Sequence, residues 1–302
     1  MDKVLLVSNA YAGSVSQRVK EVIVKALAAD FKLEVADTSA RGHASELSAE
    51  AVDLGFDAVV AFGGDGTVNE VAQGLVGTEV ALGILPGGST NVMARSLGLP
   101  RDPVEATAVI AHRLLSGTRR RVNVGRVGER YFLFSAGMGL DAEVVRRVEA
   151  DPVGKRKHGE WLWLRHALVV GSKDYRGAAP QITVEVEGAE PQRAVLAICC
   201  NGRPFTYFKR FPVDAAPLAR LDAGLDLLAL KHISTLTIPR LMYSVFVSRR
   251  HIRWRSVIYH HDIERARLVA DRPLPVQVDG DYIGERTDAP LALVPSALTL
   301  LA

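Results

Sequence analysis

One glycine-rich stretch combines the residue types that hold phosphate groups. Gly63-Gly64-Asp65-Gly66-Thr67 follows an apolar run that predicts a buried strand, and it precedes a helical pattern. Glycines let a ligand approach the main chain, and the amides of such a turn, with the positive end of the following helix, hold anions. Thr67 supplies a helix cap or a phosphate-facing hydroxyl, and Asp65 a carboxylate that can act through magnesium. The stretch therefore predicts a phosphate site rather than an ordinary tight turn.

A second glycine-rich turn follows the next predicted strand. Gly87-Gly88-Ser89-Thr90-Asn91 comes after the apolar run 81–86 and before a short helical segment. The carboxyl ends of parallel strands meet at one edge of an open sheet, where such sheets bind ligands. We therefore expect the two turns to face the same crevice.

The order of the predicted elements divides the chain into two parts. Strands alternate with helices through residue 100, which predicts a Rossmann-like parallel sheet covered on both faces. Beyond Gly117 the pattern changes to short alternating strands, interrupted by helices over about 161–171 and 238–248, which predicts an antiparallel β-sandwich. We expect a nucleotide-binding α/β domain over residues 1–120 and a β-sandwich domain over residues 121–302. The apolar last residues can return to the first domain.

The composition narrows the class of protein. The chain has 302 residues, of which 48% are hydrophobic and 24% charged, as in soluble globular proteins with a generous core. No apolar stretch is long enough to cross a bilayer, and the first residues predict a strand instead of a signal peptide, so we expect a cytoplasmic protein. Cys199 and Cys200 lie in an apolar run, which suits core packing better than a metal site or a disulfide.

The positive residues are clustered although the net charge is only +3. Clusters at 119–121, 155–158 and 249–255 can contact anionic phosphates or an acidic membrane surface, or can form solvated faces. The predicted helix before the last cluster is either an interfacial helix or a helix packed on its own sheet. Nucleic-acid binding is disfavoured because no recognised motif and no interleaved stacking aromatics accompany the clusters.

Three motifs together resemble the signatures of the diacylglycerol kinase catalytic-domain family. They are Gly63 to Thr67 with Asn69-Glu70, Leu85 to Asn91 with Ala94-Arg95, and Val278-Asp279-Gly280-Asp281. Bacterial soluble lipid kinases of this family are similar in length and layout, and the resemblance spans essentially the whole chain. NAD kinases share the first motif, so the second and third motifs favour lipid kinases.

The resemblance implies an ATP-dependent lipid kinase that uses Mg²⁺ and transfers the γ-phosphate of ATP to a lipid hydroxyl, most simply that of diacylglycerol. By the same match, Asp279 is the general base that accepts the hydroxyl proton. Asp65 is the expected partner of magnesium, and Asp222 a second candidate for a metal ion. The implied nucleotide site comprises Asn9, Thr38, Gly63, Gly64, Asp65, Gly66, Thr67, Val68, Asn69, Glu70, Gly88, Ser89, Thr90 and Asn91.

Departures from the family pattern keep two alternatives open. Val92 stands where many relatives have an aspartate, and Asp281 replaces a glutamate. The stretch 221–226 differs in spacing from the loop in which many bacterial relatives hold a structural magnesium. One alternative is NAD kinase, and the other is a catalytically inactive, nucleotide-binding regulatory protein.

The implied substrate also predicts where the protein works. A lipid kinase must meet its lipid at a membrane surface, so we expect peripheral contact with the inner membrane face. The regions of Trp161, Trp163 and Trp254, with their basic neighbours, are the expected contact points. The partners are thus a lipid and a membrane, and the oligomeric state is unknown.

Overall fold

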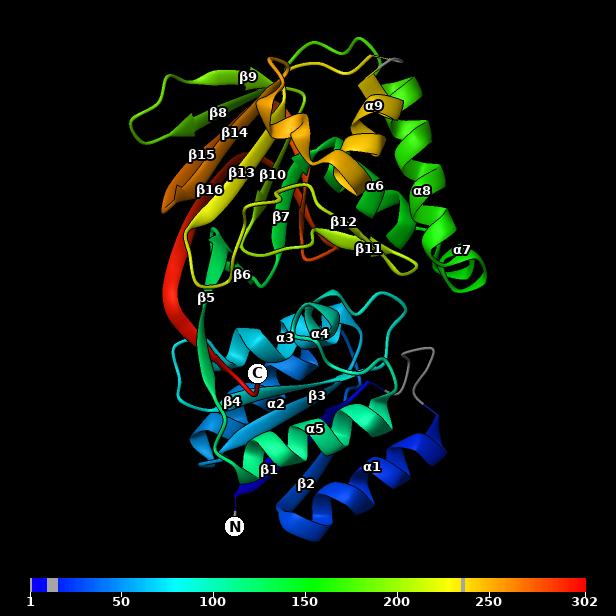
Figure 1. Ribbon diagram of the computed structural model, residues 1–302, viewed down its shortest axis with the longest axis vertical. Helices are drawn as coiled ribbons and strands as arrows, with labels where there is room; N and C mark the ends of the chain where they lie inside the picture. The colour runs from blue at the N-terminus through cyan, green and yellow to red at the C-terminus, as the bar shows by residue number, and fades with distance from the viewer. Residues whose placement is uncertain (1, 10–15, 235–236) are drawn as a thin grey trace. The chain divides into compact units, whose positions relative to one another are not determined.

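The chain forms two compact units in the computed structural model, which describes residues 2–9, 16–234 and 237–302 (Figure 1). The first unit comprises Met1–Asn123 with Pro295–Ala302, and the second comprises Val124–Val294. Most of the basic cluster predicted at 155–158 lies outside the described side chains. Within the described residues, no helix is long and apolar enough to span a bilayer.

The first unit is built on a parallel sheet with the strand order β4-β3-β1-β2. Every residue of β3 and β4 is buried, because helices cover both faces of the sheet. The helix α1 packs against α5, and α2 packs against α3 (Figure 1). The elements are β1 (Lys3–Ser8), α1 (Gln17–Asp30), β2 (Lys32–Asp37), α2 (His43–Asp53), β3 (Ala58–Gly63), α3 (Asp65–Leu75), β4 (Ala81–Pro86), α4 (Val92–Ser96) and α5 (Pro103–Leu115).

Local sequence signals fix the ends of these helices. Asp102 precedes α5, and its carboxylate accepts hydrogen bonds from the backbone N–H groups of Val104 (2.8 Å) and Glu105 (3.0 Å), while Pro103 occupies the first helical position. Ser16 caps α1 through a bond from the Val19 N–H (3.2 Å). These caps start the helices at the residues where the apolar periodicity begins.

The end of the chain completes the first unit. Thr299 and Leu300 pair in parallel with β4, and Arg121 donates to the Ser296 carbonyl (2.7 Å). Arg113 donates to the Leu301 carbonyl (2.9 Å). The last apolar residues are therefore part of the core of the first unit.

The second unit is antiparallel, with the strand order β14-β13-β10-β7-β15-β16 and with β8-β9 attached to β15. The long strand β15 changes partners at a register shift between Val269 and Leu274: its first half pairs with β8 and its last residues pair with β7. One apolar core contains buried side chains from both halves of β15. The strands are β5 (Arg120–Val127), β6 (Arg130–Phe132), β7 (Ser135–Gly139), β8 (Ile182–Val186), β9 (Gln192–Ala194), β10 (Leu196–Cys200), β11 (Thr206–Phe208), β12 (Phe211–Val213), β13 (Leu225–Leu230), β14 (Val257–Ile263), β15 (Arg265–Val278) and β16 (Asp281–Leu300).

Helical segments cover one side of these strands (Figure 1). They are α6 (Leu140–Glu149), α7 (Pro152–His158), α8 (Glu160–Val169), the π-helical turn η1 (Val170–Asp174), α9 (Thr237–Tyr243), the π-helical turn η2 (Ser244–Ser248) and the 3₁₀ turn η3 (Arg250–Arg253). The predicted fold class, a parallel α/β part followed by an antiparallel β part, is confirmed. The core position of Cys199 and Cys200 is also confirmed, since both are buried and free, and burial raises the pKa of both thiols.

Candidate functional site

The carboxyl edge of the parallel sheet contains a topological switch point. Since β1 lies between β2 and β3, the chain leaves β1 toward one side and later returns on the other. Asn9 follows β1: its backbone N–H donates to the Phe62 carbonyl (3.1 Å), and its side-chain amide donates to Thr67 Oγ1 (3.1 Å). Thr38 extends β2 at the same edge, where its N–H donates to the Ser8 carbonyl (2.9 Å). Three of the predicted nucleotide-site residues therefore meet where such sheets bind ligands.

The two glycine-rich turns touch each other through their backbones at this edge. The Gly87 N–H donates to the Gly63 carbonyl (2.7 Å), and a Cβ on Gly88 would lie 2.8 Å from the Gly64 Cα. Asn91 closes the second turn in the left-handed conformation (φ 49°): its Oδ1 accepts from the Gly88 N–H (2.9 Å) and its Nδ2 donates to the Gly88 carbonyl (2.7 Å). This backbone contact agrees with the expectation that the two turns lie at the same edge of the sheet.

The N-terminus of α3 is capped by a residue without a side chain. Gly64 has an ordinary extended conformation (φ −85°, ψ −177°), and a Cβ there would meet nothing closer than 3.5 Å. As a glycine, Gly64 itself offers no side-chain capping hydrogen bond to the described part of this helix end. Packing among the described residues thus does not require glycine at position 64, and the positive end of a helix is a place that suits an anion. Gly63 differs, since a Cβ there would lie 2.5 Å from Thr67 Oγ1.

The other predicted nucleotide-site residues divide between the edge and the core. Ser89 is exposed and Thr90 and Glu70 are half-buried, whereas Val68 and Asn69 are buried on α3. The Asn69 side chain accepts a hydrogen bond from Gln73 Nε2 (3.1 Å) within the helix. Val68 and Asn69 are therefore packed within the first unit, and their contact with a nucleotide remains a prediction.

The predicted metal ligands differ in their surroundings. Asp65, in the first turn of α3, accepts a hydrogen bond from the Met93 N–H of α4 (3.3 Å). Asp222 receives two hydrogen bonds from the Arg220 guanidinium (2.9 and 3.0 Å). Within the described residues, no group of three His, Cys, Asp or Glu side chains could hold a metal ion. A single carboxylate still fits Mg²⁺, which proteins often hold with one or two carboxylates and the substrate's phosphates.

In the second unit, the third motif forms a hairpin turn between β15 and β16. Val278 pairs with Asp281, and the two residues between them, Asp279 (φ 50°) and Gly280 (φ 83°), both have positive φ. Asp-Gly is a preferred sequence for a two-residue turn of this kind. The motif therefore sets the register between β15 and β16, in addition to its predicted chemical role.

The side chain of Asp279 is held by backbone amides. The residue is only 4% exposed, and its carboxylate accepts hydrogen bonds from the N–H groups of Leu133 (2.7 Å), Phe134 (3.0 Å) and Ser135 (2.9 Å). Successive backbone amides that converge in this way form an anion site. The carboxylate is thus fixed in one orientation by the junction between β6 and β7.

Asp141 and Gln277, which the sequence motifs did not include, support this turn. The buried Gln277 side chain accepts from the Gly280 N–H (2.9 Å) and donates to Asp141 Oδ2 (2.8 Å). Burial raises the pKa of Asp141 to about 6, and the hydrogen bond from Gln277 opposes that rise. The only signal in the sequence is that Gln277 lies two residues before Asp279, at the end of the strand that leads into the turn.

Comparisons with known proteins agree with these features. The family model of the diacylglycerol kinase catalytic domain matches residues 3–127. A protein of Chromohalobacter salexigens named "Probable lipid kinase YegS-like" is 30% identical over 94% of this chain and 88% of its own length. A Bacillus subtilis protein named "Diacylglycerol kinase" is 32% identical over 89% of this chain and 85% of its own length.

The fold has a match among solved structures. A crystal structure of a diacylglycerol kinase from Bacillus anthracis str. Sterne superposes with a TM-score of 0.76 and 24% identity, over 99% of this chain and 96% of the other. The match extends over both units of the chain, beyond the segment that the family model covers. The chain belongs to the diacylglycerol kinase catalytic-domain family of lipid kinases.

Proposed function

We propose that this protein transfers the γ-phosphate of ATP to a lipid hydroxyl, with diacylglycerol as the acceptor and phosphatidic acid as the product. The observation that carries the proposal is the bare cap at Gly64, next to a second glycine turn at the switch point of the sheet. Two glycine turns without side chains, at the positive end of a helix, leave room for a polyphosphate to approach the main chain. Relatives over most of the chain are named as diacylglycerol or lipid kinases, which supports the choice of acceptor.

The first unit would bind the nucleotide. The N–H groups at the start of α3 would face the phosphates, and Thr67, held by Asn9, would offer its hydroxyl at the same edge. Asp65 is the residue that would hold Mg²⁺, which when bound offsets the negative charge of the transferring phosphoryl group. Asp222 would not hold the metal ion, because both oxygens of its carboxylate accept hydrogen bonds from Arg220.

The second unit would supply the residue that orients the acceptor. Asp279 is the only residue of the third motif whose carboxylate is buried and fixed by three amides. Donors on a carboxylate reduce its basicity, but phosphoryl transfer depends mainly on positioning and on charge stabilisation, because its transition state is loose. Asp279 would therefore align the hydroxyl and accept its proton as the bond to phosphorus forms.

The acceptor places the enzyme at a membrane. Diacylglycerol resides in a bilayer, so we expect the protein to work in the cytoplasm, at the inner face of the membrane. The two tryptophans of α8, Trp161 and Trp163, and the basic segment around Trp254 are the proposed contacts.

An acceptor panel tests the proposal. Labelled γ-phosphate of ATP, with magnesium, is offered to diacylglycerol, monoacylglycerol, ceramide and sphingosine in mixed micelles, and to NAD without lipid. Label in phosphatidic acid supports the proposal, and label in another lipid keeps the chemistry and changes the substrate. Label in NADP would mean an NAD kinase. ATP binding without label in any acceptor would mean a regulatory protein and would refute the proposed reaction.

A further inference from the structure

A segment of the second unit is basic without any acidic residue. Residues 227–261 contain six Lys or Arg and no Asp or Glu. The described part of this segment includes α9, η2 and η3, which follow one another along the chain. One of these cations, Arg249, pairs with Asp214 from outside the segment (2.7 Å), and the others give the segment a positive charge that attracts an anionic partner.

The inner side of this segment is anchored in the unit. Leu241 and Trp254 pack against the core formed by β10, β13 and β14, and Val245 is buried. His251 is fully buried: its ring contacts the Ala215 carbonyl (2.8 Å) and the Ser244 hydroxyl (3.1 Å), and burial lowers its pKa. The inner side of the segment is thus packed on its own sheet, as one of the two sequence-based alternatives predicts.

The outer side of the same segment carries apolar side chains. Tyr243 and Val247 are each 62% exposed, four residues apart on the continuous helical turn of α9 and η2. Their neighbours Phe246 and Phe208 stand edge to face (6.4 Å), and Phe208 meets Trp161 of α8 in the same way (5.1 Å). This aromatic row joins α8, β11 and η2 into one surface.

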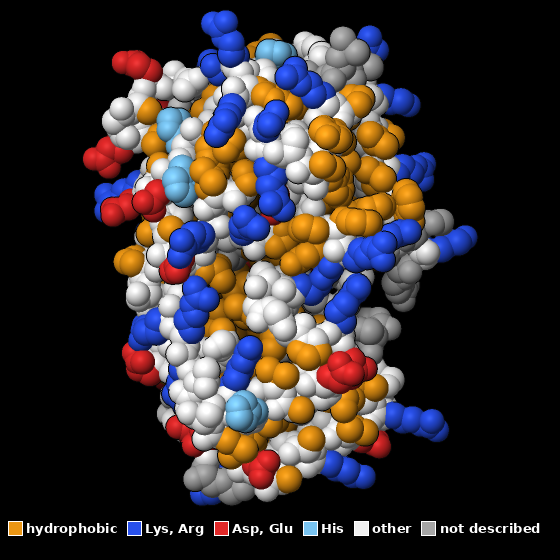
Figure 2. All heavy atoms as spheres, in the orientation of Figure 1, with side chains coloured by type: hydrophobic (Ala, Val, Ile, Leu, Met, Phe, Trp, Pro, Cys, Tyr) orange, Lys and Arg blue, Asp and Glu red, His pale blue; other side chains and the backbone are white. Residues whose placement is uncertain are grey.

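Basic side chains border the aromatic row. Lys209 Nζ lies 5.2 Å from the Trp161 ring centre, and the Arg210 guanidinium lies 5.2 Å from that of Phe211, which is 52% exposed. Figure 2 shows hydrophobic side chains gathered over α8 and α9, with Lys and Arg around them. Exposed aromatics interleaved with cations are typical of a protein face that rests at the headgroup level of a bilayer.

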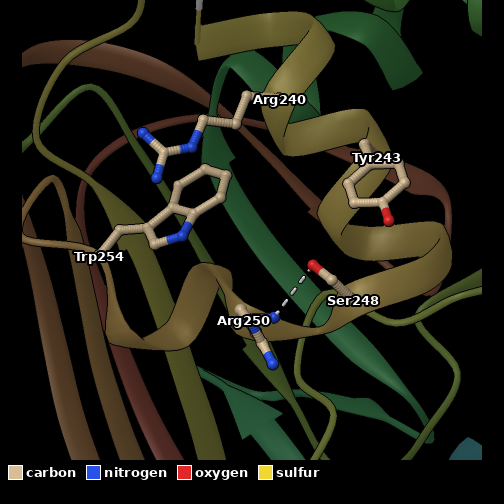
Figure 3. Close-up of a pocket in the computed structure, with 5 residues that line it drawn as sticks. All are labelled: Arg240, Tyr243, Ser248, Arg250 and Trp254. Carbon is tan, nitrogen blue, oxygen red and sulfur yellow. Dashed lines mark hydrogen bonds between the residues drawn. The ribbon is translucent and has the colours of Figure 1, made fainter.

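A hollow opens along the same helical segment, since Tyr243 of α9 and Ser248 of η2 line it (Figure 3). Its volume is about 490 Å³, and we call it the α9 hollow; it is lined by Arg240, Tyr243, Ser248, Arg250 and Trp254. The Arg240 guanidinium stacks over the Trp254 ring, 4.3 Å from its centre. Two guanidinium groups and two hydroxyls are donors of the kind that bind a phosphate oxygen.

We propose that the α9 hollow binds the phosphate of an anionic phospholipid headgroup, while Tyr243, Val247 and the aromatic row rest in the bilayer interface. A lipid fits better than a soluble phosphate because the apolar side chains beside the hollow would gain nothing from a soluble ligand. The inference rests on the proposed function only in that both need a membrane. Binding to vesicles needs neither ATP nor diacylglycerol and is measured without them.

Vesicle sedimentation of the 302-residue chain tests the inference. Wild type is mixed with phosphatidylcholine vesicles, with or without 30% phosphatidylglycerol, at low and at high salt. The test variant is Arg240→Gln/Arg250→Gln, and the matched control is Arg126→Gln/Arg265→Gln, two exposed arginines on β5 and β15 that are not part of the hollow. Two lost charges near an anionic surface should lower the partition coefficient about 30-fold. The control should bind like wild type, and salt should weaken wild-type binding.

A second arm separates the lipid from its soluble counterpart. Inorganic phosphate and glycerol 3-phosphate are titrated into wild type and the test variant without vesicles. Binding of either one, with no binding to anionic vesicles, would overturn the lipid assignment. Equal binding of wild type to both vesicle types, or equal losses in the test and control variants, would overturn the site. Vesicle binding by a protein that phosphorylates no lipid would refute the proposed function and leave this inference standing.

Discussion

The three amide bonds to Asp279 make a testable statement about stability. An Asp279→Asn substitution keeps one acceptor oxygen, which can still bond the Phe134 and Ser135 N–H groups, but it turns an NH₂ group toward the Leu133 N–H. One buried donor then has no acceptor, and the two remaining bonds lose their charge. Together these changes should lower the free energy of unfolding by about 3 kcal/mol.

Urea unfolding followed by tryptophan fluorescence measures this loss. All three tryptophans, Trp161, Trp163 and Trp254, lie in the second unit, so the signal reports the unit that contains Asp279. The matched control is Asp288→Asn, which removes an exposed carboxylate paired with Arg267 and should cost less than about 1 kcal/mol. If Asp279→Asn unfolds at the same urea concentration as wild type, the amides do not hold the carboxylate and the reasoning fails.

The same variant tests the chemical role of the carboxylate. Below the urea transition, where the variant is folded, we expect kcat for lipid phosphorylation to fall about 100-fold or more, with little change in KM for ATP. The loss of stability and the loss of turnover can be separated with Asp279→Glu. This variant keeps the negative charge and should recover part of the stability that Asp279→Asn loses. Near-normal turnover by folded Asp279→Asn would remove Asp279 as the base.

Two further predictions concern glycine and proton binding. Gly88→Ala places a Cβ 2.8 Å from the Gly64 backbone and should destabilise the first unit by about 1–3 kcal/mol, measured as a shift in thermal unfolding; an unchanged Tm would contradict the backbone contact. Because burial raises the pKa of Asp141 from 3.8 to about 6, its proton stabilises the fold fully below about pH 4, and this contribution of about 3 kcal/mol is lost as the pH rises past 6. Asp141→Asn should therefore be more stable than wild type at pH 8 but not at pH 4 in urea titrations, and equal pH profiles would contradict the shift.

The parallel half of the fold was predictable because its signals are local. Three apolar runs, β1, β3 and β4, and the short mixed strand β2, each followed by a turn and a helical period, indicate the elements from β1 to β4. The meeting of the two glycine turns also followed from the rule that parallel strands share a carboxyl edge. The caps at Ser16 and Asp102 are further local signals of this kind.

The antiparallel half was less predictable because its strands depend on distant partners. The strand β7, Ser135–Gly139, contains two glycines and lacks β-branched residues, so nothing local indicates a strand. The strand β14 ends in polar residues, and β16 continues for 20 residues across both units. The helix α6 was also missed, and with it Asp141, whose contact with Gln277 joins positions 136 residues apart.

Some site features could come only from the structure. The sequence places Asp279 in a motif, but the amides that surround it belong to residues about 145 positions earlier. The sequence also gives glycine at both 64 and 88 without distinguishing them. Only the backbone geometry separates Gly88, which packing requires, from Gly64, which packing does not require.

The most direct test of the central claim is the rate of phosphatidic acid formation from ATP and diacylglycerol in mixed micelles, measured for wild type, Gly64→Ala and Arg126→Gln. Wild type and Arg126→Gln should form labelled phosphatidic acid at similar rates. Gly64→Ala should unfold like wild type, since its Cβ meets nothing closer than 3.5 Å, yet react about 100-fold more slowly because the methyl group displaces the phosphates. Wild-type turnover by Gly64→Ala, or no product from wild type while ATP binds, would contradict the account.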